Sequence, residues 1–570
     1  LREVAAGDRP LPIAEGRRRR PTFAHCITPC TCTAPIFATY PSRAMLRRLI
    51  VADAIRDHAG VRGDAVLVAG HRIVEVGRSG DLRSADLPEE RFPGTTIVPG
   101  LRDAHLHPVG LAAALLRLSL KEATDFDAVA DMLRDAAGRL PPGAALTALR
   151  LDDESLAEGR LPDRDFLDRI APDRPALLVR YCAHVAVANS MALSLAGIGD
   201  DTPDPVGGRM DRDEQGHLTG VLRETAIEPV SAALRSLAAA VTPDDLVRSA
   251  YGLASVGLTG IGAMVSTDAG YWACAGAELD VVIEAAPRLP IPMGVLVAAV
   301  DPADLESAAA RLRFAGGRVR FAGVKMFSDG SLGGHTAAMH EGFSDLPDEL
   351  GTDRLDRAWC LGMARTALGL GGRVAIHAIG DRANTGVLDL LETLIFEGAD
   401  PAMLRIEHAS VLTPDDIIRF GGLGVTASVQ PAFLPSETTW LEKRVGPVRM
   451  QRTYPFRSLL DAGTRLAGGS DCPVEPPHPL WGMAASRDRS GLVPEEGLTP
   501  DEALRLFTLD AAAAIGEDGS LAPGAPASFT ILDDDPVTAT PDELRTMKVL
   551  GVWVEGVETE IPAGTVAWKG

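Results

Sequence analysis

Two histidines two positions apart, His105 and His107, follow the apolar run at 95–98. Successive side chains of a β-strand point to opposite faces, so residues i and i+2 share a face. Two imidazoles at that spacing can bind the same metal ion. Asp103 and Pro108 beside the pair are typical of a strand end. The pattern predicts half of a metal site, and the other ligands have to come from elsewhere in the chain.

Three more side chains of ligand type end separate apolar segments, namely His377 in R-V-A-I-H, His408 in L-R-I-E-H and Asp471 in L-A-G-G-S-D. Each alone has a structural explanation, because a histidine can be hydrogen-bonded near a core and an aspartate can cap a helix. In a parallel barrel, however, the carboxyl ends of all strands meet at one face, where barrel enzymes place their chemistry. The sequence therefore predicts that His105, His107, His377, His408 and Asp471 converge on one site.

Lys325 is the sixth candidate, and it lies inside the apolar segment V-R-F-A-G-V-K-M-F. Only five of the 56 basic residues are lysines, so arginine carries most of the positive charge. A buried ammonium needs a partner, and an ion pair with Asp329 is one explanation. The other is carboxylation, in which carbon dioxide adds to the neutral amine and gives a carbamate that can bridge two divalent metals. We favour carboxylation, because the guanidinium of an arginine stays protonated and cannot do this chemistry.

Short apolar strands alternate with helical segments across the middle of the chain, which indicates βαβ units and the α/β class. A (β/α)8 barrel, or TIM barrel, needs eight strands, and ten candidates are present. Two of them, near 145–150 and 176–181, lie within a stretch at about 120–235 that we interpret as an inserted subdomain covering the barrel mouth. The strands that remain for the barrel lie near 97–105, 259–265, 292–298, 319–327, 373–378, 403–408, 424–430 and 465–470.

The two ends of the chain are predicted to form a small β-sandwich domain together. Segment 64–76 reads as two β-rich runs around a glycine turn, and 527–532 and 549–557 also have strand composition. The predicted domains are an N-terminal extension at 1–44, the β-sandwich at 45–97 and 519–570, and the barrel domain at 98–518 with its insertion.

The first 44 residues differ in composition from the rest of the chain. They include four consecutive arginines at 17–20, six prolines and three of the seven cysteines. His25, Cys26, Cys30 and Cys32 are of zinc-ligand type, but we favour a disordered tail or translated upstream sequence with the natural start at Met45. The segment also lacks the apolar region of a secretory signal. The other cysteines are scattered, which favours reduced thiols in a cytoplasmic protein; they are Cys182, Cys274, Cys360 and Cys472.

The composition limits the classes of partner that the protein is expected to bind. The 570 residues carry a formal net charge of −22, which argues against nucleic acid or an anionic membrane surface. No apolar run reaches the roughly 18 residues of a membrane-spanning helix. With 46% hydrophobic and 24% charged residues, the chain has a globular composition. We therefore expect a small-molecule partner, no nucleic acid and no membrane, and a homodimer is compatible with these counts.

The combined pattern of H-x-H, Lys, His, His and Asp resembles the metal-dependent amidohydrolase superfamily. More narrowly, the chain is similar to the amidohydrolase 3 family of YtcJ-like proteins, which includes N-substituted formamide deformylase. The resemblance extends from about residue 50 to 570. Its motifs are A-E-G-R-L-P-D-R at 157–164, H-V-A-V-A-N-S at 184–190, L-T-G-V-L-R-E at 218–224, K-M-F-S-D-G-S-L-G-G-H-T-A-A at 325–338, I-H-A-I-G-D-R-A at 376–383, I-E-H-A at 406–409, G-S-D-C-P-V-E-P-P at 469–477 and G-S-L-A-P-G-A-P-A-S-F at 519–529.

The resemblance implies two divalent metal ions, with zinc favoured by the imidazole and oxygen ligands. It implies that His105, His107 and Asp471 hold one ion, that His377 and His408 hold the other, and that carboxylated Lys325 bridges them. A hydroxide between the two ions would attack a carbonyl carbon, and Asp471 would carry the proton to the leaving nitrogen. The expected activity is hydrolysis of a C–N bond other than a peptide bond, in an amide, N-acyl or N-formyl compound.

The substrate itself is not encoded in a motif, and the chain departs from the family where substrate contacts are expected. Position 335 is a histidine where many relatives resemble G-S-R-T. His184, His335 and Asp329 are the candidates for substrate contact. Two alternatives stay open. One is a mononuclear deaminase of a cyclic amidine, against which Lys325 argues, and the other is a non-catalytic barrel scaffold, against which the complete ligand set argues.

Overall fold

The computed structural model describes residues 47–181, 184–205, 208–234, 237, 240–267 and 278–565. All of these belong to one compact unit, Ala44–Gly570. The N-terminal histidine and cysteines considered above, together with Cys182 and Cys274, lie outside the described residues. Cys360 and Cys472 are buried free thiols. Among the described helices, none is long and apolar enough to cross a membrane.

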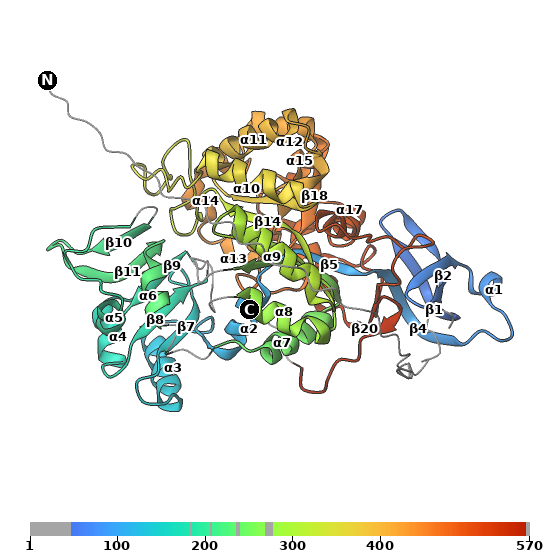
Figure 1. Ribbon diagram of the computed structural model, residues 1–570, viewed down its shortest axis with the longest axis horizontal. Coiled ribbons are helices and arrows are strands. Elements are labelled where there is room, and N and C mark those ends of the chain that lie inside the picture. The colour runs from blue at the N-terminus through green and yellow to red at the C-terminus, as the bar shows by residue number, and fades with distance from the viewer. Residues whose placement is uncertain are drawn as a thin grey trace, which may run out of the picture. The chain divides into compact units, whose positions relative to one another are not determined.

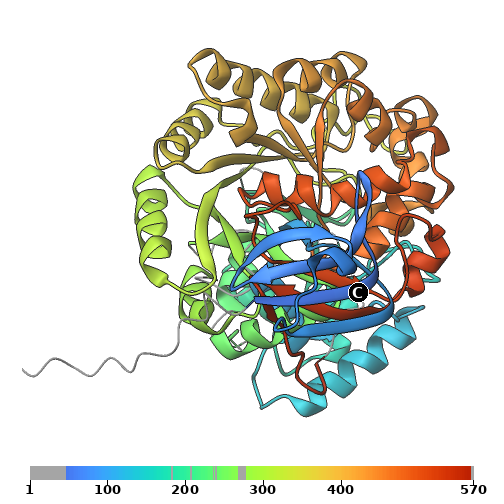
Figure 2. The ribbon, with the colours of Figure 1, turned by 90° about the vertical axis from the view of Figure 1, so that its right-hand side faces the viewer.

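Eight parallel strands form the central sheet and confirm the predicted barrel architecture. Every strand assigned to the barrel from the sequence is present in it. Helices pack around the outside of these strands (Figure 2). In sheet order the strands are β5 (Leu101–Leu106), β12 (Leu258–Ser266), β13 (Met293–Ala298), β14 (Val319–Phe327), β15 (Arg373–Ala378), β16 (Leu404–His408), β17 (Thr426–Val429) and β18 (Arg465–Gly468).

The first and last strands meet at a seam just beyond β18. The backbone N–H of Asp471 donates to the carbonyl of His105 at 2.8 Å. Gly469 makes this approach possible, because a Cβ there would lie 2.8 Å from the backbone nitrogen of His105. The seam therefore closes the barrel and brings the first and last predicted ligands together.

The helices of the barrel begin at clear local signals. Asp301, Asp356 and Thr413 each cap a helix by accepting a backbone N–H in its first turn. The helices between or after the barrel strands are α7 (Pro243–Ser255), α8 (Glu278–Ala285), α9 (Pro302–Ala315), α10 (Arg357–Gly369), α11 (Asp381–Phe396), α12 (Pro414–Leu423), α13 (Phe433–Glu437), α14 (Leu441–Met450), α15 (Phe456–Asp461), α16 (Pro479–Asp488), α17 (Pro500–Leu506), α18 (Leu509–Ala514) and α19 (Pro541–Thr546).

Part of the barrel interior is apolar. Met264, Leu296, Ala322 and Ala375 form one buried cluster there. A larger core lies between the strands and the surrounding helices. Burial of about 25 cal/mol per Å² of apolar surface makes these layers the main stabilising contribution, and they fix where the strand ends lie.

The two chain ends build one seven-stranded sheet, with strand order β21-β20-β19-β4-β1-β2-β3. The predicted β-domain from both chain ends is present, its seven strands are joined by hydrogen bonds, and strands from both ends share one buried apolar core. Antiparallel pairing of β19 with β4 brings the C-terminal strands to the N-terminal ones. The strands are β1 (Arg47–Asp57), β2 (Gly60–Ala69), β3 (Arg72–Gly77), β4 (Glu89–Pro99), β19 (Phe529–Leu532), β20 (Val549–Val554) and β21 (Val557–Glu558), and the short helix α1 (Ser79–Leu82) precedes β4.

The insertion between β5 and β12 follows helix α2 (Pro108–Leu116) and has its own six-stranded sheet, ordered β10-β11-β9-β8-β7-β6. Within the unit, Figure 1 places this sheet and the terminal sheet on opposite sides of the barrel. The insertion has two buried apolar clusters of its own. Its elements are β6 (Leu118–Ser119), α3 (Phe126–Arg139), β7 (Leu146–Leu151), α4 (Arg164–Ile170), β8 (Ala176–Arg180), β9 (Val185–Ala188), α5 (Ser190–Leu195), β10 (Gly208–Arg212), β11 (Leu218–Glu224) and α6 (Ile227–Leu234).

Candidate metal centre and active site

The six predicted ligands all lie at or just beyond the carboxyl ends of barrel strands. His105 is in β5, and His107 follows it directly. Lys325 in β14 pairs with Ala375 of β15. His377 lies two residues beyond Ala375 and is therefore nearer to the carboxyl end of β15. The backbone of His408 has φ 73° and that of Asp471 has φ 56°. Both are left-handed conformations that a non-glycine residue adopts at a cost, as is common at functional sites.

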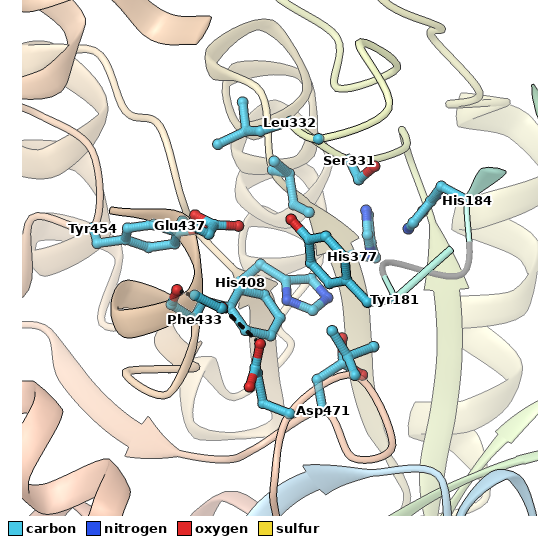
Figure 3. Close-up of a pocket in the computed structure, with 15 residues that line it drawn as sticks. Tyr181, His184, Ser331, Leu332, His377, His408, Phe433, Glu437, Tyr454 and Asp471 are labelled. Atoms are coloured by element: carbon cyan, nitrogen blue, oxygen red, sulfur yellow. Dashed lines mark hydrogen bonds between the residues drawn. The ribbon is translucent and has the colours of Figure 1, made fainter. Parts of the chain in front are cut away.

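The carboxylate of Asp471 lies between the first two histidines. Its Oδ1 is 3.2 Å from Nε2 of His105 and 3.1 Å from Nε2 of His107. Ligand atoms of His105, His408 and Asp471 lie within 4.8 Å of one another. The ring of His377 is 4.5 Å, between centroids, from that of His408. The structure thus gathers these five side chains at one point, and Figure 3 shows His377, His408 and Asp471 around it.

The hydrogen bonding of His105 fits a metal ligand. Its Nδ1 is 2.5 Å from Oε2 of Glu407, and a carboxylate only accepts, so the ring proton lies on Nδ1. Nε2 is buried and has no hydrogen-bond partner among the described residues. It lies 3.2 Å from Oδ1 of Asp471. In the neutral ring this nitrogen is an acceptor opposite another acceptor, an arrangement that a bound cation would stabilise.

Two buried polar residues that the sequence analysis missed orient the histidines. Glu407 receives the guanidinium of Arg405 on both oxygens as well as Nδ1 of His105. Burial alone would raise the pKa of Glu407, but Arg405 and His105 hold it well below its usual range. Gln430 accepts from Nδ1 of His408 at 2.8 Å. Outer partners of this kind fix the ring and its tautomer in metal sites.

Lys325 is 2% exposed, and its Nζ lies 4.8 Å from the centre of the Phe327 ring. Burial lowers the pKa of Lys325 to about 8, although Glu407 and Asp471 oppose this shift. The alternative partner, Asp329, is engaged elsewhere. Its oxygens accept the backbone N–H groups of Ala338, Ile379 and Gly380 and lie 3.2 Å from Nε2 of His377. The structure shows no ion pair between Lys325 and Asp329.

Comparison with known proteins identifies the family. The profile of the amidohydrolase family matches residues 93–559. The chain belongs to the amidohydrolase family. YtcJ of Bacillus subtilis is 30% identical over 489 residues, which cover 83% of this chain and 90% of YtcJ. N-substituted formamide deformylase of Arthrobacter pascens is 31% identical over 528 residues, covering 86% and 94% of the two chains.

A solved structure supports the same relationship. An uncharacterized metal-dependent hydrolase from Pyrococcus horikoshii has a TM-score of 0.68 and 28% sequence identity, covering 87% of this chain and 99% of its own. Both the family resemblance and the barrel class predicted from the sequence are confirmed. Family membership supports a metal-dependent hydrolase of C–N bonds.

The three candidates for substrate contact in this amidohydrolase lie in different surroundings. His184 lines the cavity beside the site, and its Nδ1 is 3.0 Å from both oxygens of the buried Glu224. His335 contacts Asp345 at 3.1 Å and Arg444 at 3.2 Å, and it is not among the residues that line the cavity. Asp329 is fully buried and engaged by backbone N–H groups. Of the three, the structure brings only His184 to the cavity.

The amidohydrolase cavity at the site is small, with a volume of about 40 Å³. An outer chamber of about 560 Å³ shares Tyr181, Ser436 and Glu475 with it. The inserted subdomain supplies Tyr181 and His184 to the cavity, so it lies at the carboxyl ends of the strands as expected. The lining residues are Tyr181, His184, Ser331, Leu332, Gly333, His377, Ile379, His408, Phe433, Ser436, Glu437, Tyr454, Asp471, Val474 and Glu475.

Arginine from the insertion also braces the ligand loop of the amidohydrolase. Arg150 Nη1 donates to the carbonyls of Pro473 and Val474, at 2.8 and 2.6 Å. These two residues lie two and three positions after Asp471 in the loop after β18. The insertion therefore both contributes to the cavity and holds the segment that carries one candidate ligand.

Proposed function

We propose that this amidohydrolase hydrolyses the C–N bond of an amide or N-acyl compound, with N-formyl compounds as the leading class. The proposal rests mainly on one observation, the buried Nε2 of His105, which has no hydrogen-bond partner among the described residues and lies 3.2 Å from Oδ1 of Asp471. This arrangement suits a divalent cation, and zinc matches the imidazole and carboxylate donors. The name of the Arthrobacter pascens relative supports an N-formyl substrate.

The proposed site holds two divalent ions. His105, His107 and Asp471 would bind one, His377 and His408 would bind the other, and carboxylated Lys325 would bridge them. Carboxylation forms a bond between Nζ and the carbon of carbon dioxide, with loss of one proton, and leaves an anion with two oxygens. When bound, the ions supply Lewis acidity toward a water molecule and toward the substrate carbonyl.

In this proposal, residues of the chain itself carry out the proton transfer. Asp471 is placed to accept the proton that the attacking water loses and to deliver it to the leaving nitrogen. The oxygen of the water joins the carbonyl carbon, the C–N bond breaks, and a carboxylic acid and an amine result. Glu407 and Gln430 keep the rings of His105 and His408 in place, and Tyr181 and His184 help to exclude bulk water from the cavity.

One observation favours a second candidate, a mononuclear enzyme. Ligand atoms of His105, His408 and Asp471 already converge within 4.8 Å, which suits a single ion. A mononuclear amidohydrolase-type deaminase would act on a cyclic amidine instead of an amide. Lys325, buried beside the same residues, favours the binuclear site.

Metal analysis combined with a substrate screen tests the proposal. Purified enzyme loaded with zinc is assayed against N-formyl and N-acyl amides and, in parallel, cyclic amidines. Two tightly bound ions per chain together with release of an amine from an amide are the expected results. One ion at full activity together with release of ammonia from an amidine would establish the alternative.

A further inference from the structure

The cavity wall formed by the loops after β17 and β18 carries two buried carboxyl groups and aromatic rings. We propose that Glu437 and Glu475 form a subsite for a protonated nitrogen, so that the substrate is an amide that also carries an ammonium or amidinium group. This inference deepens the proposed function and rests on it, because the same cavity would hold the amide. We call Glu437, Glu475 and the rings of Tyr181, Phe433 and Tyr454 the acidic wall.

Glu437 is the central residue of the acidic wall. Its side chain lines the cavity although the residue is only 8% exposed. The hydroxyl of Tyr454 donates to Oε2 at 2.8 Å. Within the described part of the chain, this is the only hydrogen bond to the carboxyl group, so Oε1 has no protein donor. Figure 3 shows Glu437 and Tyr454 on the side of His408 opposite His184.

Glu475 lies where the cavity and the outer chamber meet, because it lines both. It is 6% exposed, and the hydroxyl of Ser436 donates to its Oε1 at 2.6 Å. Ser436 and Glu437 are neighbours in α13, so one short helix presents the first carboxyl group and orients the second. A ligand that spans the two spaces would pass both groups.

Charge and burial favour a cation at the acidic wall. Burial raises the pKa of Glu437 to about 8, and the nearby Glu475 raises it further, with Arg180 and Arg444 opposing. Burial also raises the pKa of Glu475, with Arg150, Ser436 and Lys121 opposing. No lysine or arginine is among the lining residues of the cavity. Two desolvated carboxyl groups therefore lie along this space. Burial favours their protonated form, and a bound cation would favour the carboxylate form and pair with it.

The aromatic rings of the acidic wall also suit a cationic ligand. Tyr181, Phe433 and Tyr454 line the cavity together with the two glutamates. Rings bind cations through their negative faces, most strongly when water is excluded. An ammonium or amidinium also donates several N–H groups, which suits carboxyl oxygens that have few protein donors. A neutral substrate could also donate N–H groups to these oxygens, but it would leave a carboxylate charge in this space without a partner.

Benzamidine and benzamide form the probe pair for the test, because they are similar in shape and differ in charge. Calorimetry of the zinc-loaded enzyme is expected to show benzamidine binding about tenfold or more tightly than benzamide. Glu437→Gln and Glu475→Gln should each remove most of that preference. The matched control is Glu496→Gln, which removes a carboxyl group that is 7% exposed, is hydrogen-bonded to Ser458 and does not line the cavity.

The comparison of the two probes with unaltered enzyme decides the proposal even if a variant fails to fold. Equal affinities for the two probes, or the same loss of preference in the Glu496→Gln control, would overturn the proposal that the acidic wall binds a cation. Binding needs no turnover, so the result is separate from the proposed hydrolysis. Enzyme that selects benzamidine but hydrolyses no amide would contradict the proposed function and keep the cation subsite.

Discussion

Glu407 Oε2 lies 2.5 Å from Nδ1 of His105, although the two residues are 302 positions apart in the chain. The contact joins the strand β16 to β5 across the barrel interior. Arg405, which holds Glu407 on both oxygens, also donates to the carbonyl of Ala104 at 2.9 Å. The orientation of His105 is thus set by a buried pair that also braces the strand on which His105 lies.

Glu407→Gln should therefore weaken metal binding. The amide loses the charge that keeps the proton on Nδ1 of His105, and comparable changes in outer partners lower metal affinity about 10-fold to 100-fold. The measurement is zinc affinity by competition with a chelator, with the Tm of the metal-free protein recorded to separate folding from binding. The Glu496→Gln variant controls for loss of a buried carboxylate elsewhere. Unchanged zinc affinity in Glu407→Gln would contradict the positioning role.

Lys325→Ala is expected to abolish or greatly reduce hydrolysis, because the bridging anion is lost. Acetate or another short-chain carboxylic acid should restore part of the activity by supplying a carboxylate in the space of the side chain. Lys325→Arg should stay inactive with or without the acid, because its guanidinium cannot form a carbamate. Initial rates at increasing acid concentration give the result.

The exposed Lys548 provides the control for that series. Lys548→Ala should keep full activity and show no response to acetate. Full activity of Lys325→Ala without any added acid would exclude the carbamate bridge.

Removal of metal should lower both activity and thermal stability. In the proposed site a bound ion would lie against both Nε2 of His105 and the carboxylate of Asp471, and it would stabilise the folded state by mass action. Dialysis against a chelator is expected to lower Tm and stop hydrolysis, and zinc should restore both. A Tm that does not respond to zinc, measured by calorimetry, would argue against these residues as the ligands.

The pH dependence of stability provides a prediction at Glu278, away from the metal centre. Burial raises the pKa of Glu278 to about 8, while its Oε2 accepts the N–H of Ser266 at 3.0 Å. An unfolded glutamate titrates near about 4.3. Between these pKa values the folded state holds a proton that the unfolded state has lost. The contribution of Glu278 to the free energy of unfolding is therefore fully present at low pH and is lost as pH rises through about 8.

Glu278→Gln keeps an acceptor for Ser266 but cannot titrate. Between about pH 5 and about pH 9, the Tm of the variant should fall by a few degrees less than the Tm of the parent. Glu214→Gln, which removes an exposed carboxyl group, should follow the parent curve. Parallel curves for Glu278→Gln and the parent, in calorimetric scans, would contradict the assignment.

The convergence of the candidate ligands and the barrel strands could be predicted because both depend on local patterns. Each ligand follows or ends an apolar strand, and in a closed parallel barrel all strand ends meet at the same face. The short run I-E-H-A even contained Glu407 beside His408. Its role could not be read there, because it depends on His105 in a strand far away in sequence.

Most residues that line the cavity, by contrast, could not be predicted from local patterns. His335 looked suitable by residue type, but Asp345 and Arg444 hold it outside the cavity lining. Glu437 and Tyr454, which do line the cavity, lie in the short helix α13 and in a loop, whose positions depend on packing and not on periodicity. The terminal strands were likewise located correctly by composition, whereas their joining into a single sheet depends on the pairing of β4 with β19.

The seam between β5 and β18 has a further consequence. The hydrogen bond from Asp471 N to His105 O closes the ring of strands, and the side chains of the same two residues face each other at the proposed metal site. Any fluctuation that parts these strands also separates the two candidate ligands. An ion bound there as proposed would be released when the barrel opens, and while bound it would hold the two edge strands of the sheet together.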